Sequence, residues 1–153
     1  EYFYELMRVS ENQIIWGGNY FLDYLKNTRC CIMWDKIQKF SGADFELAWT
    51  SFDKSSKAFR MSRIEAYSNR NSKIKDKFIK IHITQKPVKL YEWLLINYAK
   101  EGDKILDTHL GSGSIAIAAH NLGFDLEGYE LDKEYFEAAK KRLKQHQSQL
   151  RIL

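Results

Sequence analysis

Residues 104–147 alternate between short apolar runs and helical patterns, and this alternation constrains the fold more than any other feature of the sequence. Residues 104–107 and 124–130 predict strands, whereas residues 114–122 and 132–147 have the periodicity of helices. Two strands joined through a helix are parallel neighbours in one sheet. The pattern therefore predicts an α/β fold in which helices cover a parallel sheet.

The loop between the first of these strands and its helix reads DTHLGSGS, over residues 107–114. Glycines at such a junction let the backbone approach a ligand closely, and the helix N-terminus offers backbone N–H donors. Asp107 ends the first strand, where it can accept hydrogen bonds from an amine or another polar ligand group. Glu130 ends the second strand 23 residues later, where a carboxylate can bind both hydroxyls of a ribose. These positions predict a site for an adenosine-containing ligand across the ends of two neighbouring strands.

Two ligands fit this description of the glycine loop. Gly111, Gly113 and Ala116 match the dinucleotide fingerprint G-x-G-x-x-A. However, Asp107 lies four positions before the first glycine, where it would repel a pyrophosphate but suits the cationic, amino-acid end of S-adenosylmethionine. Only 40 residues follow Gly113, whereas a dinucleotide fold led by this motif needs several further strands. S-adenosylmethionine is therefore the favoured cofactor, and a dinucleotide-binding oxidoreductase is the alternative.

The sequence before the glycine loop supplies the remaining elements. A helix is expected to begin at a Thr84 cap, with Pro87 in its first turn, and to continue to about Ala99. Residues 62–80 lack periodicity and predict a mobile loop. Short helices are predicted at 2–9 and 19–27, and strands at 12–16, 30–34, 45–52 and 57–61. Three tryptophans that end or line these strands are expected in the core: Trp16, Trp34 and Trp49.

The net charge of +4 is unevenly distributed along the chain. Residues 54–89 contain eleven lysines and arginines against two acids, a local charge of +9, so the remainder carries −5. A basic segment on an acidic remainder is typical of a surface that faces a polyanion. The alternative is a solvated, flexible loop whose lysines keep it soluble.

The order of these elements, with several strands before the glycine loop, resembles that of the DNA amino-methyltransferases, which methylate adenine N6 or cytosine N4. It resembles their permuted class, in which the catalytic region precedes the cofactor-binding region. Residues 82–87 (HITQKP) are similar to the family's H-P-T-Q-K-P, and residues 107–114 to its D-P-F-x-G-S-G-T. Residues 16–21 (WGGNYF) and 46–50 (ELAWT) resemble segments of phage-type members. The resemblance covers most of the chain and implies a Rossmann-like methyltransferase fold, with a mostly parallel sheet and helices on both faces.

The resemblance also implies roles for individual residues. Lys86 would pair with the carboxylate of S-adenosylmethionine, and Glu130 would hold its ribose. Thr108 and His109 replace the family's usual Pro-Phe, so the family's pattern does not define the contacts of His109. The cofactor-binding residues implied in this way are Thr84, Gln85, Lys86, Asp107, Thr108, His109, Gly111, Ser112, Gly113, Ser114 and Glu130.

In this class, the segment between the catalytic half and the T-Q-K-P helix carries target recognition, and residues 54–80 occupy that position. The resemblance therefore implies double-stranded DNA as the partner, with basic side chains neutralising phosphates. The residues implied are Arg60, Arg63, Arg70, Lys73, Lys75 and Lys77. A homodimer is left open.

The family's catalytic motif, an Asp, Asn or Ser followed by Pro-Pro and an aromatic residue, is absent from this sequence. The chain contains one proline, Pro87, which belongs to the T-Q-K-P motif. Asp35 is a weak substitute, because no proline follows it and Lys36 is expected to neutralise it. In the family the Pro-Pro motif precedes a helix like residues 1–9, so we expect it upstream of Glu1. The chain itself would then hold no catalytic residue and be inactive. A catalytically inactive DNA- or cofactor-binding remnant is the alternative.

Cysteine usage and the N-terminal sequence indicate the setting. Cys30 and Cys31 are adjacent, which suits neither a disulfide nor a C-x-x-C metal pair. No apolar run approaches a membrane span, and the N-terminus lacks the pattern of a signal peptide. We therefore expect a cytoplasmic protein without a bound metal. A single methyltransferase domain is expected, with catalytic-side strands in 1–53, target recognition in 54–80 and cofactor binding in 81–153.

Overall fold

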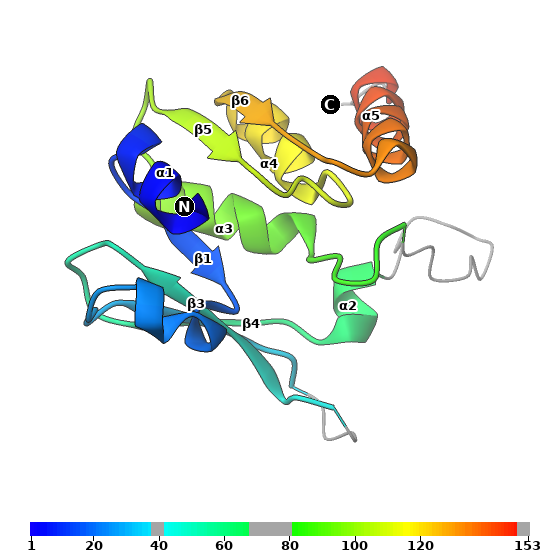
Figure 1. Ribbon diagram of the computed structural model, residues 1–153. Coiled ribbons are helices and arrows are strands. Elements are labelled where there is room, and N and C mark those ends of the chain that lie inside the picture. The colour runs from blue at the N-terminus through cyan, green and yellow to red at the C-terminus, as the bar shows by residue number, and fades with distance from the viewer. Residues whose placement is uncertain (38–41, 68–80, 150–153) are drawn as a thin grey trace. The chain divides into compact units, whose positions relative to one another are not determined.

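Two sheets organise the chain, and each belongs to its own compact unit, one spanning residues 1–65 and the other residues 66–153 (Figure 1). The computed structural model describes residues 1–37, 42–67 and 81–149. Within these ranges, no helix combines the length and the apolar character needed to cross a membrane. Helices and strands occur in both units, so the predicted α/β class is confirmed.

The first unit is built on a mixed four-stranded sheet in the order β1-β3-β2-β4. Strand β3 pairs antiparallel with both β1 and β2, whereas β4 pairs parallel with β2. Only nine residues join β2 to β3, too few for a parallel crossover, which needs about a dozen or more. Two of the three strand pairs in this sheet are antiparallel, whereas the sequence predicts a mostly parallel sheet. The strands are β1 (Ile14–Trp16), β2 (Cys31–Asp35), β3 (Phe45–Thr50) and β4 (Lys57–Arg60).

The helical parts of this unit differ from the predictions in two places. Helix α1 (Tyr2–Val9) is present as predicted, but two 3₁₀ turns, η1 (Gly18–Tyr20) and η2 (Leu22–Tyr24), replace the helix expected at 19–27. Helix α2 (Arg63–Tyr67), which begins in this unit and ends just past its last residue, lies where only a loop was expected. The Ser62 hydroxyl accepts the backbone N–H of Glu65 at 3.1 Å, and a serine followed three residues later by glutamate is the capping-box sequence. Because residues 62–80 as a whole lack periodicity, the sequence pattern does not distinguish this short helix from the polar residues that follow it.

Tryptophan anchors the core of the first unit. Trp34 and Trp49 are buried as predicted, and Trp16 is half-buried. Each buried indole keeps a hydrogen bond: Trp34 Nε1 donates to the Met61 carbonyl at 3.0 Å, and Trp49 Nε1 donates to the Lys26 carbonyl at 2.8 Å. These bonds let large aromatic groups be buried without an unsatisfied donor.

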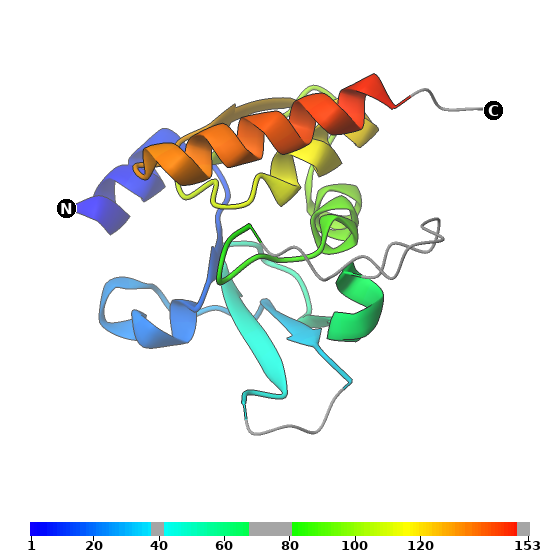
Figure 2. The same cartoon turned by 90° about the vertical axis from the view of Figure 1, so that its right-hand side faces the viewer.

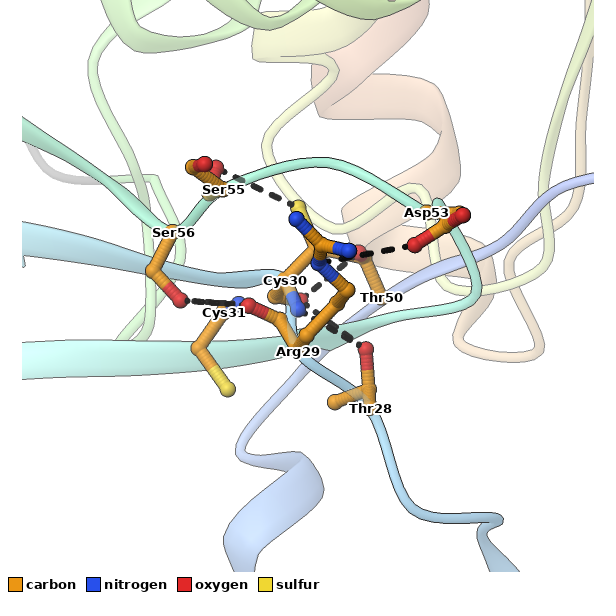
Figure 3. A network of polar contacts seen from close by, with 8 residues as sticks. All are labelled: Thr28, Arg29, Cys30, Cys31, Thr50, Asp53, Ser55 and Ser56. Atoms are coloured by element: carbon orange, nitrogen blue, oxygen red, sulfur yellow. Dashed lines mark hydrogen bonds and ion pairs between the residues drawn. The ribbon is translucent and has the colours of Figure 1, made fainter.

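The start of β2 is fixed by short polar side chains (Figure 3). The Thr50 hydroxyl donates to the Cys30 carbonyl at 2.7 Å, and the Cys30 N–H donates to the Thr28 hydroxyl at 3.0 Å. The Cys31 N–H donates to the Ser56 hydroxyl at 2.9 Å. Both cysteines are free thiols. Hydroxyl side chains therefore satisfy backbone groups at the point where the strand enters the core.

The second unit has the predicted strand–helix–strand–helix order after α3 (Val88–Tyr98). Its elements are β5 (Lys104–Asp107), α4 (Ser114–Leu122), β6 (Asp125–Gly128) and α5 (Lys133–Ser148). The strands β5 and β6 pair in parallel. Helix α3 packs on α4, and α4 contacts β6 and α5; Figure 2 shows the long α5 helix in orange and red. Leu95, Ala118 and Ala119 form the buried centre, against which Ile105 and Leu126 of the strands pack.

Helix α3 begins three residues later than a cap at Thr84 predicts. Its first residue is Val88, preceded by Pro87, and the Thr84 side chain does not cap it. A residue before proline is disfavoured in helical conformation, so Lys86 cannot continue a helix into Pro87. The Thr84 hydroxyl instead contacts the His82 ring. Residues 82–86 therefore form an ordered non-helical segment ahead of α3.

Gly18 provides a test of packing in the first unit. A Cβ built on it would stand 2.5 Å from the Trp49 Cβ and 3.2 Å from the Trp49 backbone nitrogen. We expect Gly18→Ala to lower the free energy of unfolding by about 1–3 kcal/mol, because the strand must shift to admit the methyl group. Urea titration measures this change. Asn19→Ala, an exposed position in the same turn, should stay within about 0.5 kcal/mol of wild type. Equal losses in both variants would contradict the packing argument.

Candidate functional site

The carboxyl ends of β5 and β6 lie at one edge of the parallel pair, and backbone hydrogen bonds continue between the segments that follow the two strands. Asp107 is in register with Gly128. The Tyr129 N–H then donates to the Asp107 carbonyl, and the Leu110 N–H donates to the Tyr129 carbonyl, both at 2.8 Å. These bonds hold the loop after β5 against the segment after β6. The structure therefore brings the carboxylates of Asp107 and Glu130 to the same edge, as the sequence predicts.

The Glu130 carboxylate is held by backbone N–H groups from both sides. Gly111 donates to Oε2 at 2.8 Å, and Asp132 donates to Oε1 at 3.1 Å. Partial burial acts to raise the pKa of Glu130, but the hydrogen bonds from Asp132 and Gly111 outweigh burial and hold that pKa below its ordinary value. Glu130 is therefore an ionised acceptor whose position is fixed by the loop it faces.

Asp107 has a different electrostatic environment. Its Oδ1 accepts the backbone N–H of His109 at 2.9 Å. Burial raises the pKa of Asp107 above its ordinary value, although the His109 N–H and the charge of Lys86 oppose the rise. The neighbouring Glu130 charge adds to the rise. The Asp107 carboxylate is thus incompletely compensated, and a cationic group beside it would stabilise its charge.

The two glycines of the loop are required by backbone conformation. Gly111 has φ +51° and Gly113 has φ +67°, in the left-handed region that side chains disfavour. A Cβ on Gly113 would also lie 3.0 Å from the Cβ of Ala139 on α5. Gly113 therefore allows close packing of the loop on α5, in addition to the turn.

The two serines of the loop face inward. The Ser112 and Ser114 hydroxyls are buried and lie 3.1 Å apart. Arg142 of α5 donates from Nη1 to the Ser112 carbonyl and to the Ser114 hydroxyl, each at 2.9 Å. The Arg142 side chain therefore holds the loop to α5. Sequence reasoning missed Arg142, because nothing in the helical pattern of α5 distinguishes it from the other charged positions.

The segment of residues 81–86 folds against the same loop. The buried Gln85 side chain accepts the Ile81 N–H at 3.1 Å and so closes the segment on itself. Lys86 is half-buried and close enough to Asp107 for its charge to lower the pKa of that carboxyl. Thr84 is exposed. The structure therefore places Lys86 near Asp107 at the start of the glycine loop, and its role toward a cofactor stays a prediction.

His82 joins this segment to the loop and was not predicted as a site residue. Its ring atoms lie 3.5 Å from the position that a Cβ on Gly111 would occupy. The ring also meets that of Tyr135 edge-on, with 4.4 Å between centroids. The only sequence signal for His82 is its place at the head of the HITQKP motif. In the loop itself, the Thr108 hydroxyl and His109 Nδ1 lie 3.0 Å apart, so these two residues contact one another.

The basic residues predicted to bind DNA are only partly described by the structure. Arg60 is exposed and pairs with Asp35, with 3.2 Å between Nε and Oδ2. Arg63 begins α2. The remaining predicted positions, Arg70, Lys73, Lys75 and Lys77, lie outside the described residues.

The expected pairing of Lys36 with Asp35 is wrong. Lys36 Nζ pairs with Glu46 at 3.1 Å. Successive side chains of a strand point to opposite faces, so neighbours in sequence seldom pair directly. No cluster of His, Cys, Asp and Glu suited to a metal ion occurs among the residues that the structure describes.

A parallel strand pair that ends in two carboxylates, with a glycine turn at the following helix, defines a Rossmann-like site for a nucleotide-type ligand. The comparison with known families is more specific. The sequence model of the DNA methylase family N6_N4_Mtase matches residues 11–141, and the chain belongs to this family. The resemblance to DNA amino-methyltransferases is confirmed.

Curated relatives match over limited segments. The chain is 45% identical over 62 residues to the type II methyltransferase M2.DpnII of Streptococcus pneumoniae, covering 40% of this chain and 23% of that protein. It is 39% identical over 77 residues to the type II methyltransferase M.HpaI of Haemophilus parainfluenzae, covering 50% of this chain and 22% of that protein. The matched segments therefore span about a quarter of the length of these relatives.

Solved structures of methyltransferases share the fold. The M1.HpyAVI–SAM complex aligns with a TM-score of 0.59 and 25% identity, covering 86% of this chain and 74% of that chain. The cytosine-N4-specific PvuII DNA methyltransferase aligns with a TM-score of 0.53 and 15% identity, covering 80% of this chain and 51% of that chain. The predicted Rossmann-like methyltransferase fold is therefore confirmed.

The raised pKa of Asp107 predicts a gain in stability when its charge is removed. The folded state holds a proton on Asp107 more tightly than the unfolded chain does, so ionisation of this group opposes folding at neutral pH. Asp107→Asn should therefore raise the free energy of unfolding at pH 7, since its amide oxygen can still accept the His109 N–H. The gain should vanish as the pH falls through the raised pKa to below the ordinary value of 3.8, where Asp107 is uncharged in both states.

Urea titrations between pH 7 and pH 3 measure this difference. Asp125→Asn, an exposed aspartate at the opposite end of β6, is the matched control and should show no such gain. A loss of stability at pH 7 in Asp107→Asn would contradict the burial argument.

Proposed function

We propose that this chain is the cofactor-binding part of an S-adenosylmethionine-dependent DNA methyltransferase that methylates an exocyclic amine in double-stranded DNA. The observation that carries the proposal is the Glu130 carboxylate, which lies at the strand edge beside Asp107 and accepts the Gly111 N–H. S-adenosylmethionine supplies a methyl group on a sulfonium centre, which activates it for transfer. Membership of the DNA methylase family supports this function.

The residues at the strand edge fit the chemical groups of this cofactor. Glu130 Oε2 accepts the Gly111 N–H and Oε1 accepts the Asp132 N–H, and because a carboxylate has about four lone-pair sites it can still accept hydrogen bonds from ribose hydroxyls. The incompletely compensated Asp107 suits the cationic, amino-acid end. Lys86, beside Asp107, would pair with the cofactor's carboxylate. Thr84 and Gln85 would shape the segment that presents Lys86.

The same geometry argues against a dinucleotide. A dinucleotide site needs the N–H groups of the glycine turn for a pyrophosphate. In this chain the Gly111 N–H is donated to Glu130, and the carboxylate of Asp107 lies at the start of the loop. A phosphate in this turn would compete with Glu130 for the Gly111 N–H, and the carboxylates of Asp107 and Glu130 would both repel it. An oxidoreductase is therefore the weaker proposal.

We place the DNA-binding surface on the basic segment of residues 54–80, with Arg60 and Arg63 among its contacts. Arg60 is paired with Asp35 in an exposed ion pair, and such pairs contribute little, about 0–1 kcal/mol. A DNA phosphate could therefore displace Asp35 at small cost. Adenine N6 is preferred to cytosine N4 as the target because it is the commoner target in this family.

The residues that would activate the target amine are not in this sequence. Residues 1–153 contain a single proline, so they hold no Pro-Pro motif of the kind that the family uses to bind the flipped base. We propose that these residues bind cofactor and DNA without catalysing transfer. The same absence favours the second candidate, an inactive DNA- or cofactor-binding methyltransferase remnant.

Ligand binding tests the cofactor site. Isothermal titration calorimetry should detect S-adenosylhomocysteine binding to the chain and no binding of NAD. Glu130→Ala should weaken S-adenosylhomocysteine binding at least tenfold, because each hydrogen bond to a charged group is worth about 1.5–3 kcal/mol. Glu101→Ala, an exposed residue before β5, is the control and should bind as wild type does. Binding of NAD without S-adenosylhomocysteine would overturn the proposal.

A methylation assay tests the assignment of catalysis. With S-adenosylmethionine and double-stranded DNA, residues 1–153 alone should transfer no methyl group above background, while a full-length type II methyltransferase serves as positive control. Robust methylation would show that the acceptors for the amine protons lie within these residues, contrary to the proposal.

A further inference from the structure

His82 connects two parts of the proposed cofactor site that are distant in sequence. One is the segment that carries Thr84 and Lys86, and the other is the glycine loop. The Thr84 backbone N–H donates to His82 Nδ1 at 3.2 Å, and the Thr84 hydroxyl lies 3.0 Å from the same nitrogen. The same ring lies close to Gly111: its Cγ and Nδ1 atoms are each 3.5 Å from the position that a Cβ on Gly111 would occupy. The imidazole therefore accepts a hydrogen bond from the first part and lies close to the second.

These contacts specify the state of the ring. A backbone N–H can only donate, so His82 Nδ1 must be the unprotonated, acceptor nitrogen when it receives the Thr84 N–H. The ring then carries a proton on Nε2, and the Thr84 hydroxyl lies 3.0 Å from the same Nδ1 atom. The ring is held in position by Tyr135 of α5, 4.4 Å away between centroids. One acceptor atom on a fixed ring thus determines the path of the backbone at Thr84.

The backbone at Thr84 matters because Lys86 follows two residues later. A hydrogen bond of 3.1 Å from the Gln85 N–H to the His82 carbonyl closes a turn over residues 82–85, directly before Lys86. Gly111, which lies close to the His82 ring, donates its N–H to Glu130. Hydrogen bonds and spatial proximity therefore connect Thr84, through His82 and Gly111, to Glu130. They link the residues proposed for the amino-acid end of the cofactor to the residue proposed for its ribose.

We propose that His82 is a positioning residue whose Nδ1 orients the segment of residues 84–86 toward the amino-acid end of the cofactor. This inference rests on the proposed function, because it assumes an S-adenosyl ligand at the strand edge. His82 makes no covalent contribution. It sets the geometry of Lys86 relative to Asp107 and Glu130.

The test uses two ligands and two substitutions. S-adenosylhomocysteine has the amino-acid end, whereas 5′-methylthioadenosine keeps the adenosine and lacks that end. His82→Phe keeps a ring against Gly111 and Tyr135 but removes the acceptor. His82→Asn removes the ring but keeps an amide oxygen close to the position of Nδ1. Calorimetry on the full chain measures all affinities, and circular dichroism verifies that each variant is folded.

We expect His82→Phe to weaken S-adenosylhomocysteine binding at least fivefold and to change 5′-methylthioadenosine binding less than twofold. His82→Asn should recover most of the lost S-adenosylhomocysteine affinity. If His82→Phe fails to fold, Thr84→Ala removes the hydroxyl that lies 3.0 Å from Nδ1 and should show the same ligand selectivity at smaller amplitude. Equal weakening of both ligands, or weakening of neither, would overturn the proposal. A wild-type chain that binds neither ligand would overturn the proposed function, and this inference with it.

Discussion

The hydrogen bonds accepted by the Glu130 carboxylate are the interaction on which the second unit depends. They join the end of β6 to the glycine loop through Gly111 and to the start of α5 through Asp132. Asp132 in turn caps α5 by accepting the N–H groups of Glu134 and Tyr135. Glu130 and Asp132 therefore determine both the position of the loop and the start of the last helix. An acid held in this way is ionised and oriented before any ligand arrives, which reduces the ordering cost of binding.

The glycine loop has a packing side and a ligand side. Its serines and Gly113 face α5, where Arg142 and Ala139 contact them. Its carboxylate at Asp107 and the acceptor at Glu130 lie at the strand edge. Small residues in the G-S-G-S sequence are therefore needed for close helix packing as much as for ligand approach. A larger residue in this sequence would therefore disturb both the packing on α5 and the binding surface, because the two sides belong to one short loop.

Local signals in the sequence predicted most elements, and the errors have identifiable causes. The alanine-rich pattern of α4 and the helical periodicity of α5 gave boundaries within a residue of those observed. The start of α3 was misplaced because the restriction that Pro87 imposes on Lys86 outweighs the capping preference of Thr84. Strand pairing in the first unit was predicted too uniformly, since the short β2–β3 connection permits only an antiparallel neighbour.

The sequence by itself determined the strand–helix–strand order of residues 104–130 and the carboxylates at the two strand ends, because alternation and glycine position are local properties of the chain. Tertiary structure alone decided which residues surround those carboxylates. Arg142 bonds to Ser112, and His82 lies close to Gly111, although about thirty residues of sequence separate the members of each pair. Lys36 forms its ion pair with Glu46 and not with the neighbouring Asp35. Such contacts depend on how helices and strands pack on one another, and the periodicity of a single element does not encode that geometry.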